Sequence, residues 1–155
     1  MGILRFFSVL VFIFCFAYGC GQKNEAPDFE LFTAGERTQP LGLSKINADS
    51  QVLLAFWASW CPACVDEIPI LNTWNEKFSD RGLKIIGVNV GEPRKDVEKF
   101  IKNHKILYPV VLDEAGEVAD RYGIVGLPVT VLLAKGGEIL YYGFALPPRM
   151  EERLS

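Results

Sequence analysis

Two cysteines, Cys61 and Cys64, stand three positions apart where an expected strand gives way to an expected helix. Residues 52–57 form an apolar run, typical of a strand buried on both faces of a sheet. Residues 62–79 place apolar side chains at helical spacing, and Pro62 suits the first turn because its missing N–H costs nothing there. The unpaired N–H groups and dipole at a helix N-terminus lower a thiol pKa and favour the reactive thiolate. The spacing predicts a redox-active pair, with Cys64 one turn after Cys61 and within reach to form a disulfide.

Composition limits the other function classes. The chain has 155 residues, half of them hydrophobic, which is enough for one domain with a proper core. The formal net charge is −3 and no run of Lys and Arg appears, so we expect no nucleic-acid partner. His104 is the single histidine, which leaves little material for a metal site or a catalytic triad.

The first twenty residues have the features of an export signal. Residues 6–18 are uncharged and apolar, too short to span a bilayer comfortably and typical of the core of a secretory signal. Small residues then precede Cys20, a pattern similar to a bacterial lipoprotein cleavage site with the lipid on the Cys20 thiol. An ordinary cleaved signal and an uncleaved anchor are the alternatives. We expect residues 1–19 to be the signal peptide, 20–26 a tether and 27–155 the domain.

Strands and helices alternate through that domain. We expect strands over residues 28–32, 38–43, 52–57, 83–90, 110–112, 129–134 and 138–142, and helices over residues 62–79, 96–103 and 118–122, with a small helix in the tail. Ser44 is expected to cap a short helical turn. This order predicts an α/β domain with a mixed central sheet flanked by helices and with an N-terminal hairpin.

Two stretches are similar to the thioredoxin superfamily. One is the sequence FWASWCPAC at residues 56–64, and the other is GLPVT at residues 126–130, directly before an expected strand. More narrowly, the chain resembles the membrane-tethered TlpA/ResA/CcmG-type thiol–disulfide oxidoreductases over about residues 26–145. The resemblance implies a thioredoxin-like fold in which residues 91–108 belong to an inserted strand–helix segment.

The resemblance also implies roles for single residues. Cys61 would be the nucleophile that attacks a partner's disulfide, and Cys64 would resolve the mixed disulfide. Leu127 and Pro128 would form a cis peptide that faces the cysteines and binds a substrate strand through the backbone. Trp60 and Pro62, which flank Cys61, would contribute to the same substrate-binding surface.

One departure from thioredoxins concerns proton transfer. Thioredoxins carry a buried aspartate in the strand before the cysteines, where this chain has Ala55, and a buried carboxylate helps to take up the proton of the second thiol. Glu67 is the candidate substitute, three residues after Cys64, and relatives of the ResA type carry a glutamate at this place. The alternative is that Glu67 is an ordinary solvated acid near a helix N-terminus.

These features favour an extracytoplasmic enzyme, facing the periplasm or the cell exterior. We expect a thiol–disulfide oxidoreductase that reduces disulfides of exported proteins, such as apocytochrome c during cytochrome c maturation. The Cys61–Cys64 disulfide would serve without a further cofactor. A reductant in an oxidising compartment needs a membrane electron donor.

Two alternatives remain open. A peroxiredoxin-like peroxidase would use a threonine-containing loop before its cysteine, which this chain lacks before Cys61. A non-enzymatic copper-delivery module of thioredoxin fold would space its cysteines one residue wider and add a histidine ligand.

Overall fold

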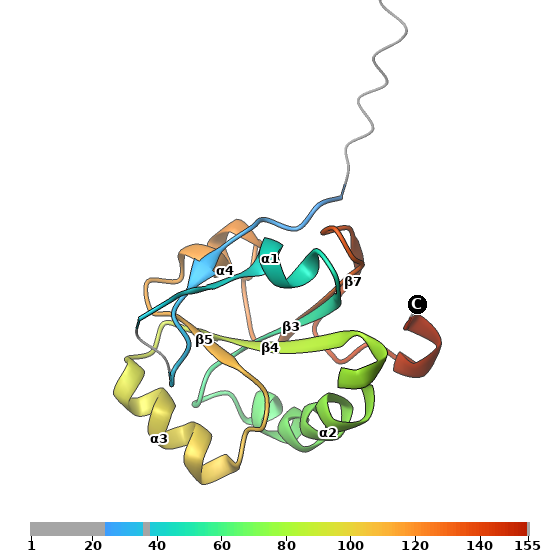
Figure 1. The fold of residues 1–155 in the computed structure, drawn as a ribbon. Helices are drawn as coiled ribbons and strands as arrows, with labels where there is room; N and C mark the ends of the chain where they lie inside the picture. Colours follow the sequence, from blue (N-terminus) through green and yellow to red (C-terminus); the bar gives the residue numbers. More distant parts are fainter. Residues whose placement is uncertain (1–23, 36–37, 155) are drawn as a thin grey trace, which may run out of the picture.

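The computed structural model describes residues 24–35 and 38–154 (Figure 1). The expected signal peptide, Cys20 and the first part of the expected tether lie outside the described residues. The strands are β1 (Glu30–Leu31), β2 (Leu41–Gly42), β3 (Gln51–Trp57), β4 (Leu83–Val90), β5 (Val110–Asp113), β6 (Val129–Leu133) and β7 (Ile139–Gly143). The helices are α1 (Leu43–Asn47), α2 (Pro62–Phe78), α3 (Arg94–His104) and α4 (Glu117–Arg121), with 3-10 turns η1 (Ser79–Arg81) and η2 (Met150–Arg153).

The central sheet has five strands in the order β5-β4-β3-β6-β7. β3, β4 and β5 are parallel to one another, because helices α2 and α3 connect them. β6 pairs antiparallel with β3 on one side and with β7 on the other. The sheet is therefore mixed, with β3 at its centre, and the expected thioredoxin-like architecture is confirmed. α3 and β5 lie within or directly after the expected inserted segment.

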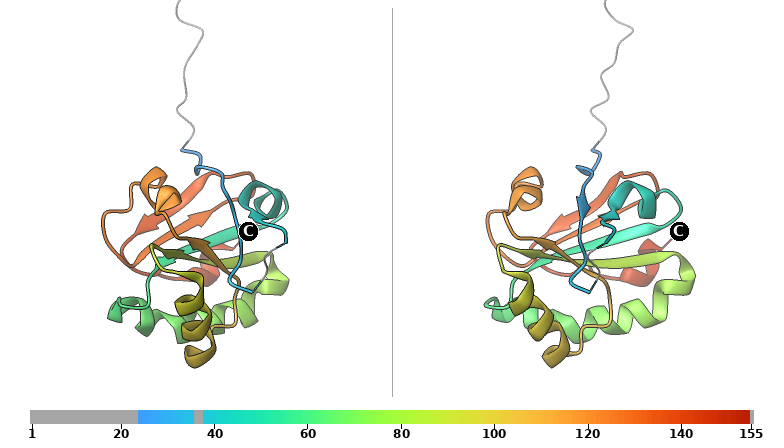
Figure 2. Two further views of the ribbon diagram at one scale, coloured as in Figure 1. Left: turned by 90° about the vertical axis from the view of Figure 1, so that its left-hand side faces the viewer. Right: turned by 60° about the vertical axis from the view of Figure 1, so that its left-hand side comes forward.

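Helices cover both faces of this sheet (Figure 2). α2, α3 and η2 pack on one face and α1 and α4 on the other. The seven residues of β3 are all buried, and their side chains alternate between the two cores. Leu53, Ala55 and Trp57 face α2, while Val52, Leu54 and Phe56 face α4. This alternation explains the continuous apolar run in the sequence.

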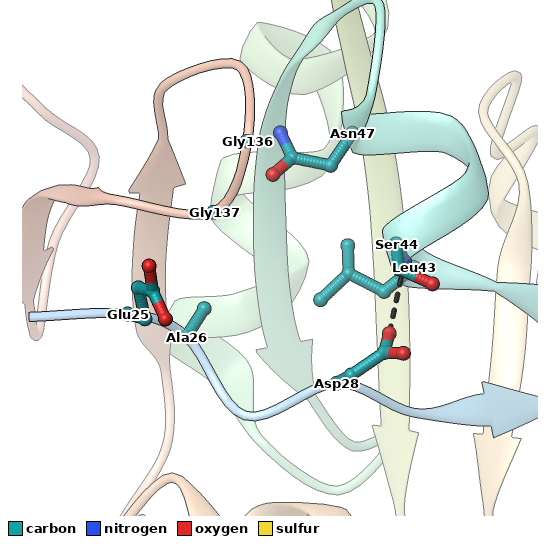
Figure 3. A pocket seen from close by; sticks show the side chains of 8 residues that line it. All are labelled: Glu25, Ala26, Asp28, Leu43, Ser44, Asn47, Gly136 and Gly137. Carbon is teal, nitrogen blue, oxygen red and sulfur yellow. Dashed lines mark hydrogen bonds between the residues drawn. The ribbon is translucent and has the colours of Figure 1, made fainter. Parts of the chain in front are cut away.

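The N-terminal hairpin is present but short. β1 and β2 pair antiparallel over two residues each. The expectation that Ser44 caps α1 is wrong, because the N-cap is Gly42 and Ser44 lies inside the helix. The carboxylate of Asp28 accepts the Ser44 N–H at 2.9 Å instead, so the capping group comes from a distant part of the chain (Figure 3).

Figure 3 also shows a pocket between α1 and the β6–β7 turn, lined by Asp28, Asn47 and Gly136 among others. It lies at the end of β6 away from Pro128, and thus away from the cysteine pair. Within residues 24–35 and 38–154, no helix is both long enough and apolar enough to cross a membrane.

Gly87 in β4 leaves space for a buried aromatic cluster. A Cβ atom there would lie 3.0 Å from Trp57 Nε1, 3.1 Å from a Tyr108 ring carbon and 3.3 Å from Val110. Trp57 also packs against Phe100 of α3, with ring centroids 5.2 Å apart. The absence of a side chain at Gly87 therefore lets the Trp57 ring fit between the strand and α3.

We predict that Gly87→Ala lowers the free energy of unfolding by about 1–3 kcal/mol, the usual cost of overpacking a core. Denaturant unfolding of purified protein measures this difference. Gly35→Ala is the control, because nothing lies within 4 Å of the Cβ it would add. Equal losses in the two variants would contradict the packing argument.

Candidate redox site

The cysteine pair lies where β3 passes into α2. β3 ends at Trp57, and the chain makes a turn in which the Cys61 N–H donates to the Ala58 carbonyl oxygen at 3.2 Å. α2 then begins at Pro62, with Cys61 as its N-cap residue. The turn and the proline at the first helical position together explain why the helix starts here.

The two sulfurs form a disulfide in this structure, and the Cα atoms of Cys61 and Cys64 are 5.3 Å apart. Both residues are buried, with 4% of each exposed. The Cys64 N–H points at Cys61 Sγ, at a donor–acceptor distance of 3.2 Å. In the reduced protein the same N–H and the helix dipole would favour a thiolate on Cys61.

The Leu127–Pro128 peptide bond is cis, as the resemblance implied. β6 begins at the next residue and pairs with β3 in a register that sets Val129 opposite Phe56. The cis peptide therefore lies at the end of the sheet where β3 leads into the cysteine turn. Leu127 is half-buried and packs against both cores, including the core that contains the two cysteines.

Exposed apolar side chains accompany these elements. Trp60, directly before Cys61, is 68% exposed, and Val125, two residues before Leu127, is 91% exposed. Pro62 is exposed as well. A large exposed indole next to a buried cysteine suits contact with another protein.

Glu67 is partly buried on α2, three residues after Cys64. Burial raises the pKa of its carboxyl above the ordinary value of 4.5, while a hydrogen bond from the Leu146 backbone N–H acts in the opposite direction. The pKa of Tyr108 is also raised, first by burial and then by the negative charge of Glu67. Partial burial and a raised pKa favour the interpretation of Glu67 as a functional acid over that of a solvated one.

Sequence reasoning missed a second buried acid, Glu92. It follows β4, and its carboxylate accepts hydrogen bonds from Asn89 Nδ2 and from the Ser59 N–H, each at 2.7 Å. The available signal was topological: β3 and β4 are parallel, so the residues after both strands meet at one edge of the sheet. In the sequence, Glu92 stands between a glycine and a proline directly after the expected strand over residues 83–90, a local pattern that indicates no buried acid.

Among the described residues, no group of three or more His, Cys, Asp and Glu side chains is arranged to hold a metal ion. The mixed sheet, the cysteine pair at the N-terminus of α2 and the cis-proline loop define a thioredoxin-like protein. The AhpC/TSA family model matches residues 23–142, and the chain belongs to that family.

Curated relatives are similar to this chain over most of its length. The thiol–disulfide oxidoreductase ResA of Geobacillus thermodenitrificans is 39% identical over 116 residues, which cover 75% of this chain and 65% of that protein. ResA of Bacillus subtilis is 35% identical over 120 residues, covering 77% of this chain and 65% of that protein. The chain therefore matches just under two thirds of the length of these two relatives.

Solved structures share the fold. The thioredoxin domain of a thiol–disulfide oxidoreductase from Bacteroides vulgatus superposes with a TM-score of 0.75 at 27% identity, covering 86% of this chain and 97% of that one. StoA from Bacillus subtilis superposes with a TM-score of 0.69 at 27% identity, covering 84% and 96%.

We predict a pH-dependent difference between the wild type and Glu67→Gln. Because burial raises the carboxyl pKa in the folded state, the folded protein binds more protons than the unfolded chain just above pH 4.5. As pH rises through that interval, the free energy of unfolding of the wild type should therefore fall relative to that of the variant, because only the wild type loses the Glu67 contribution. Denaturant unfolding across this range measures both slopes, and identical slopes would return Glu67 to the class of solvated acids.

Proposed function

We propose that this protein is a thiol–disulfide oxidoreductase that acts through Cys61 and Cys64. The observation that carries the proposal is the position of Cys61 at the N-cap of α2, with the Cys64 N–H directed at its sulfur. The relatives named thiol–disulfide oxidoreductase ResA support the same activity.

The proposed reaction has two exchange steps. The Cys61 thiolate attacks one sulfur of a partner disulfide, which forms a mixed disulfide and releases the other partner sulfur as a thiolate. The Cys64 thiol then loses its proton and attacks Cys61, which frees the second partner thiolate. The partner gains two electrons and the protein is left with the Cys61–Cys64 disulfide. In this scheme Glu67 is the acceptor for the Cys64 proton, because its raised pKa makes it a stronger base than an ordinary glutamate.

The substrate-binding surface is proposed to consist of Trp60, Pro62, Leu127 and Pro128. The exposed indole supplies apolar contact area, and the backbone of Leu127 offers hydrogen-bonding groups to an extended segment of the partner. Such contacts depend little on the partner's side chains, so the class of substrate is an exposed protein disulfide. Reduction of exported proteins, including apocytochrome c, is the physiological role that the resemblance favours.

We predict that Cys61→Ser abolishes reduction of a model protein disulfide, because the thiolate that attacks the partner at the N-cap of α2 is lost. Cys64→Ser should instead accumulate mixed disulfides with partner proteins, because the resolving thiol is missing. The measurement is non-reducing electrophoresis of cell extracts, with the Cys61→Ser/Cys64→Ser double variant as the control. If Cys64→Ser captures no more protein than the double variant, the exchange mechanism fails.

Assays of the purified protein with hydrogen peroxide and with a protein disulfide distinguish the proposed oxidoreductase from a peroxidase. An oxidoreductase of the proposed kind reduces the protein disulfide and consumes hydrogen peroxide slowly. Fast peroxide consumption that Cys61→Ser removes, without disulfide reduction, would favour a peroxidase.

We further propose that the domain is exported and attached to the membrane through a lipid on Cys20. The support is the sequence alone: an apolar run, small residues and then a cysteine at the start of a polar stretch. A short tether over residues 20–26 would then hold the domain at the membrane surface, where a membrane electron donor could reduce its disulfide.

We predict that a radiolabelled fatty acid labels the wild type and not Cys20→Ala, because the lipid needs that thiol. Cys15→Ala is the matched control, since Cys15 lies inside the expected signal. Equal labelling of the wild type and Cys20→Ala would exclude the lipoprotein interpretation.

A further inference from the structure

Glu92 carries an unusual set of contacts for a residue outside the cysteine motif. It lies in the connection between β4 and α3 and is only 9% exposed. Burying a carboxylate is costly unless hydrogen bonds compensate the loss of water. Glu92 has three such contacts, and two of them come from Ser59.

The contacts divide between the two carboxylate oxygens. Oε2 accepts the backbone N–H of Ser59 and the side-chain amide of Asn89, each at 2.7 Å. Oε1 accepts the Ser59 hydroxyl. Hydrogen bonds to a charged acceptor are about twice as strong as neutral ones, so this carboxylate holds Ser59 at both its backbone and its side chain.

Ser59 is part of the turn that places the nucleophile. The turn is closed by the Cys61 N–H bound to the Ala58 carbonyl oxygen, and Ser59 is its second residue. Trp60 follows and projects into solvent, and Cys61 then caps α2. Fixing the Ser59 N–H therefore fixes the backbone that leads to both residues.

We propose that Glu92 is a positioning residue for the redox site, which holds the Ala58–Cys61 turn through hydrogen bonds so that Cys61 stays at the N-cap of α2. This inference rests on the proposed function, because it concerns the same nucleophile. The geometry that stabilises the Cys61 thiolate, with the Cys64 N–H aimed at Sγ, depends on that turn.

A competing role for Glu92 is purely electrostatic. A negative charge near Cys61 disfavours the thiolate and raises the thiol pKa. Removing the charge would then lower that pKa, whereas releasing the turn would raise it. The two roles therefore predict opposite signs for the same measurement.

Three substitutions separate the roles. Glu92→Gln removes the charge and can keep every contact, because its amide oxygen can replace Oε2 and its amide nitrogen can donate to the Ser59 hydroxyl oxygen. Glu92→Asp keeps the charge but is one methylene too short to reach the same donors. Glu92→Ala removes the charge and the hydrogen bonds together. Glu114→Ala, at an exposed position after β5, is the control for a loss of one negative charge.

The measurement is the pH dependence of Cys61 alkylation in the reduced full-length protein, made in the Cys64→Ser background so that one thiol of the pair reacts. We expect Glu92→Ala and Glu92→Asp to raise the thiol pKa by about half a unit, which slows alkylation about threefold at a pH well below that pKa, where the rate follows the fraction of thiolate. Glu92→Gln and Glu114→Ala should stay close to the parent protein. If Glu92→Ala does not fold, the Asp and Gln variants decide the question.

Two results would overturn the proposal. Faster alkylation in both the Gln and Ala variants, with the Asp variant unchanged, would assign Glu92 an electrostatic role. Unchanged thiol pKa values in all variants, with only a lower melting temperature, would make Glu92 a structural residue. Neither result bears on whether Cys61 exchanges disulfides, since alkylation needs no partner protein.

Discussion

The contact between the Cys64 N–H and Cys61 Sγ, at 3.2 Å, is the interaction on which the account of this site depends. It exists because Cys61 is both the last residue of a turn and the N-cap residue of α2, where its side chain lies beside the free N–H groups of the first helical turn. A helix N-terminus stabilises negative charge over a distance of about one turn. The N-cap residue can therefore serve as a nucleophile, and a thiol one turn further along lies close enough to resolve it.

The rest of the fold keeps this junction fixed. β3 is buried along its whole length between two cores, so the position of its last residue, Trp57, is fixed. β6 lies beside β3 and brings the cis peptide to the same end of the sheet, while the β4–α3 connection brings Glu92 there. Three separate segments thus meet at one edge, which is the usual place for sites in sheets of parallel strands.

Much of this architecture could be predicted from the sequence, because its signals are local. The apolar run of β3 and the helical spacing in α2 each indicated an element that the structure contains. The contacts that could not be predicted join residues distant in the chain: Asp28 with Ser44, Glu92 with Ser59, and Glu67 with Tyr108 and Leu146. Glu67 was proposed from its position after Cys64, but Glu92 needed the register of β3 with β4 to become visible as part of the site.

The most direct test is the titration of Cys61 in the reduced protein, followed by the ultraviolet absorbance of its thiolate. The account predicts a thiol pKa clearly below the ordinary value of about 8.5, with Cys61 ionising before Cys64. A Cys61 thiol that titrates at or above the ordinary value would contradict it, because the helix N-terminus and the Cys64 N–H would then contribute nothing to its reactivity.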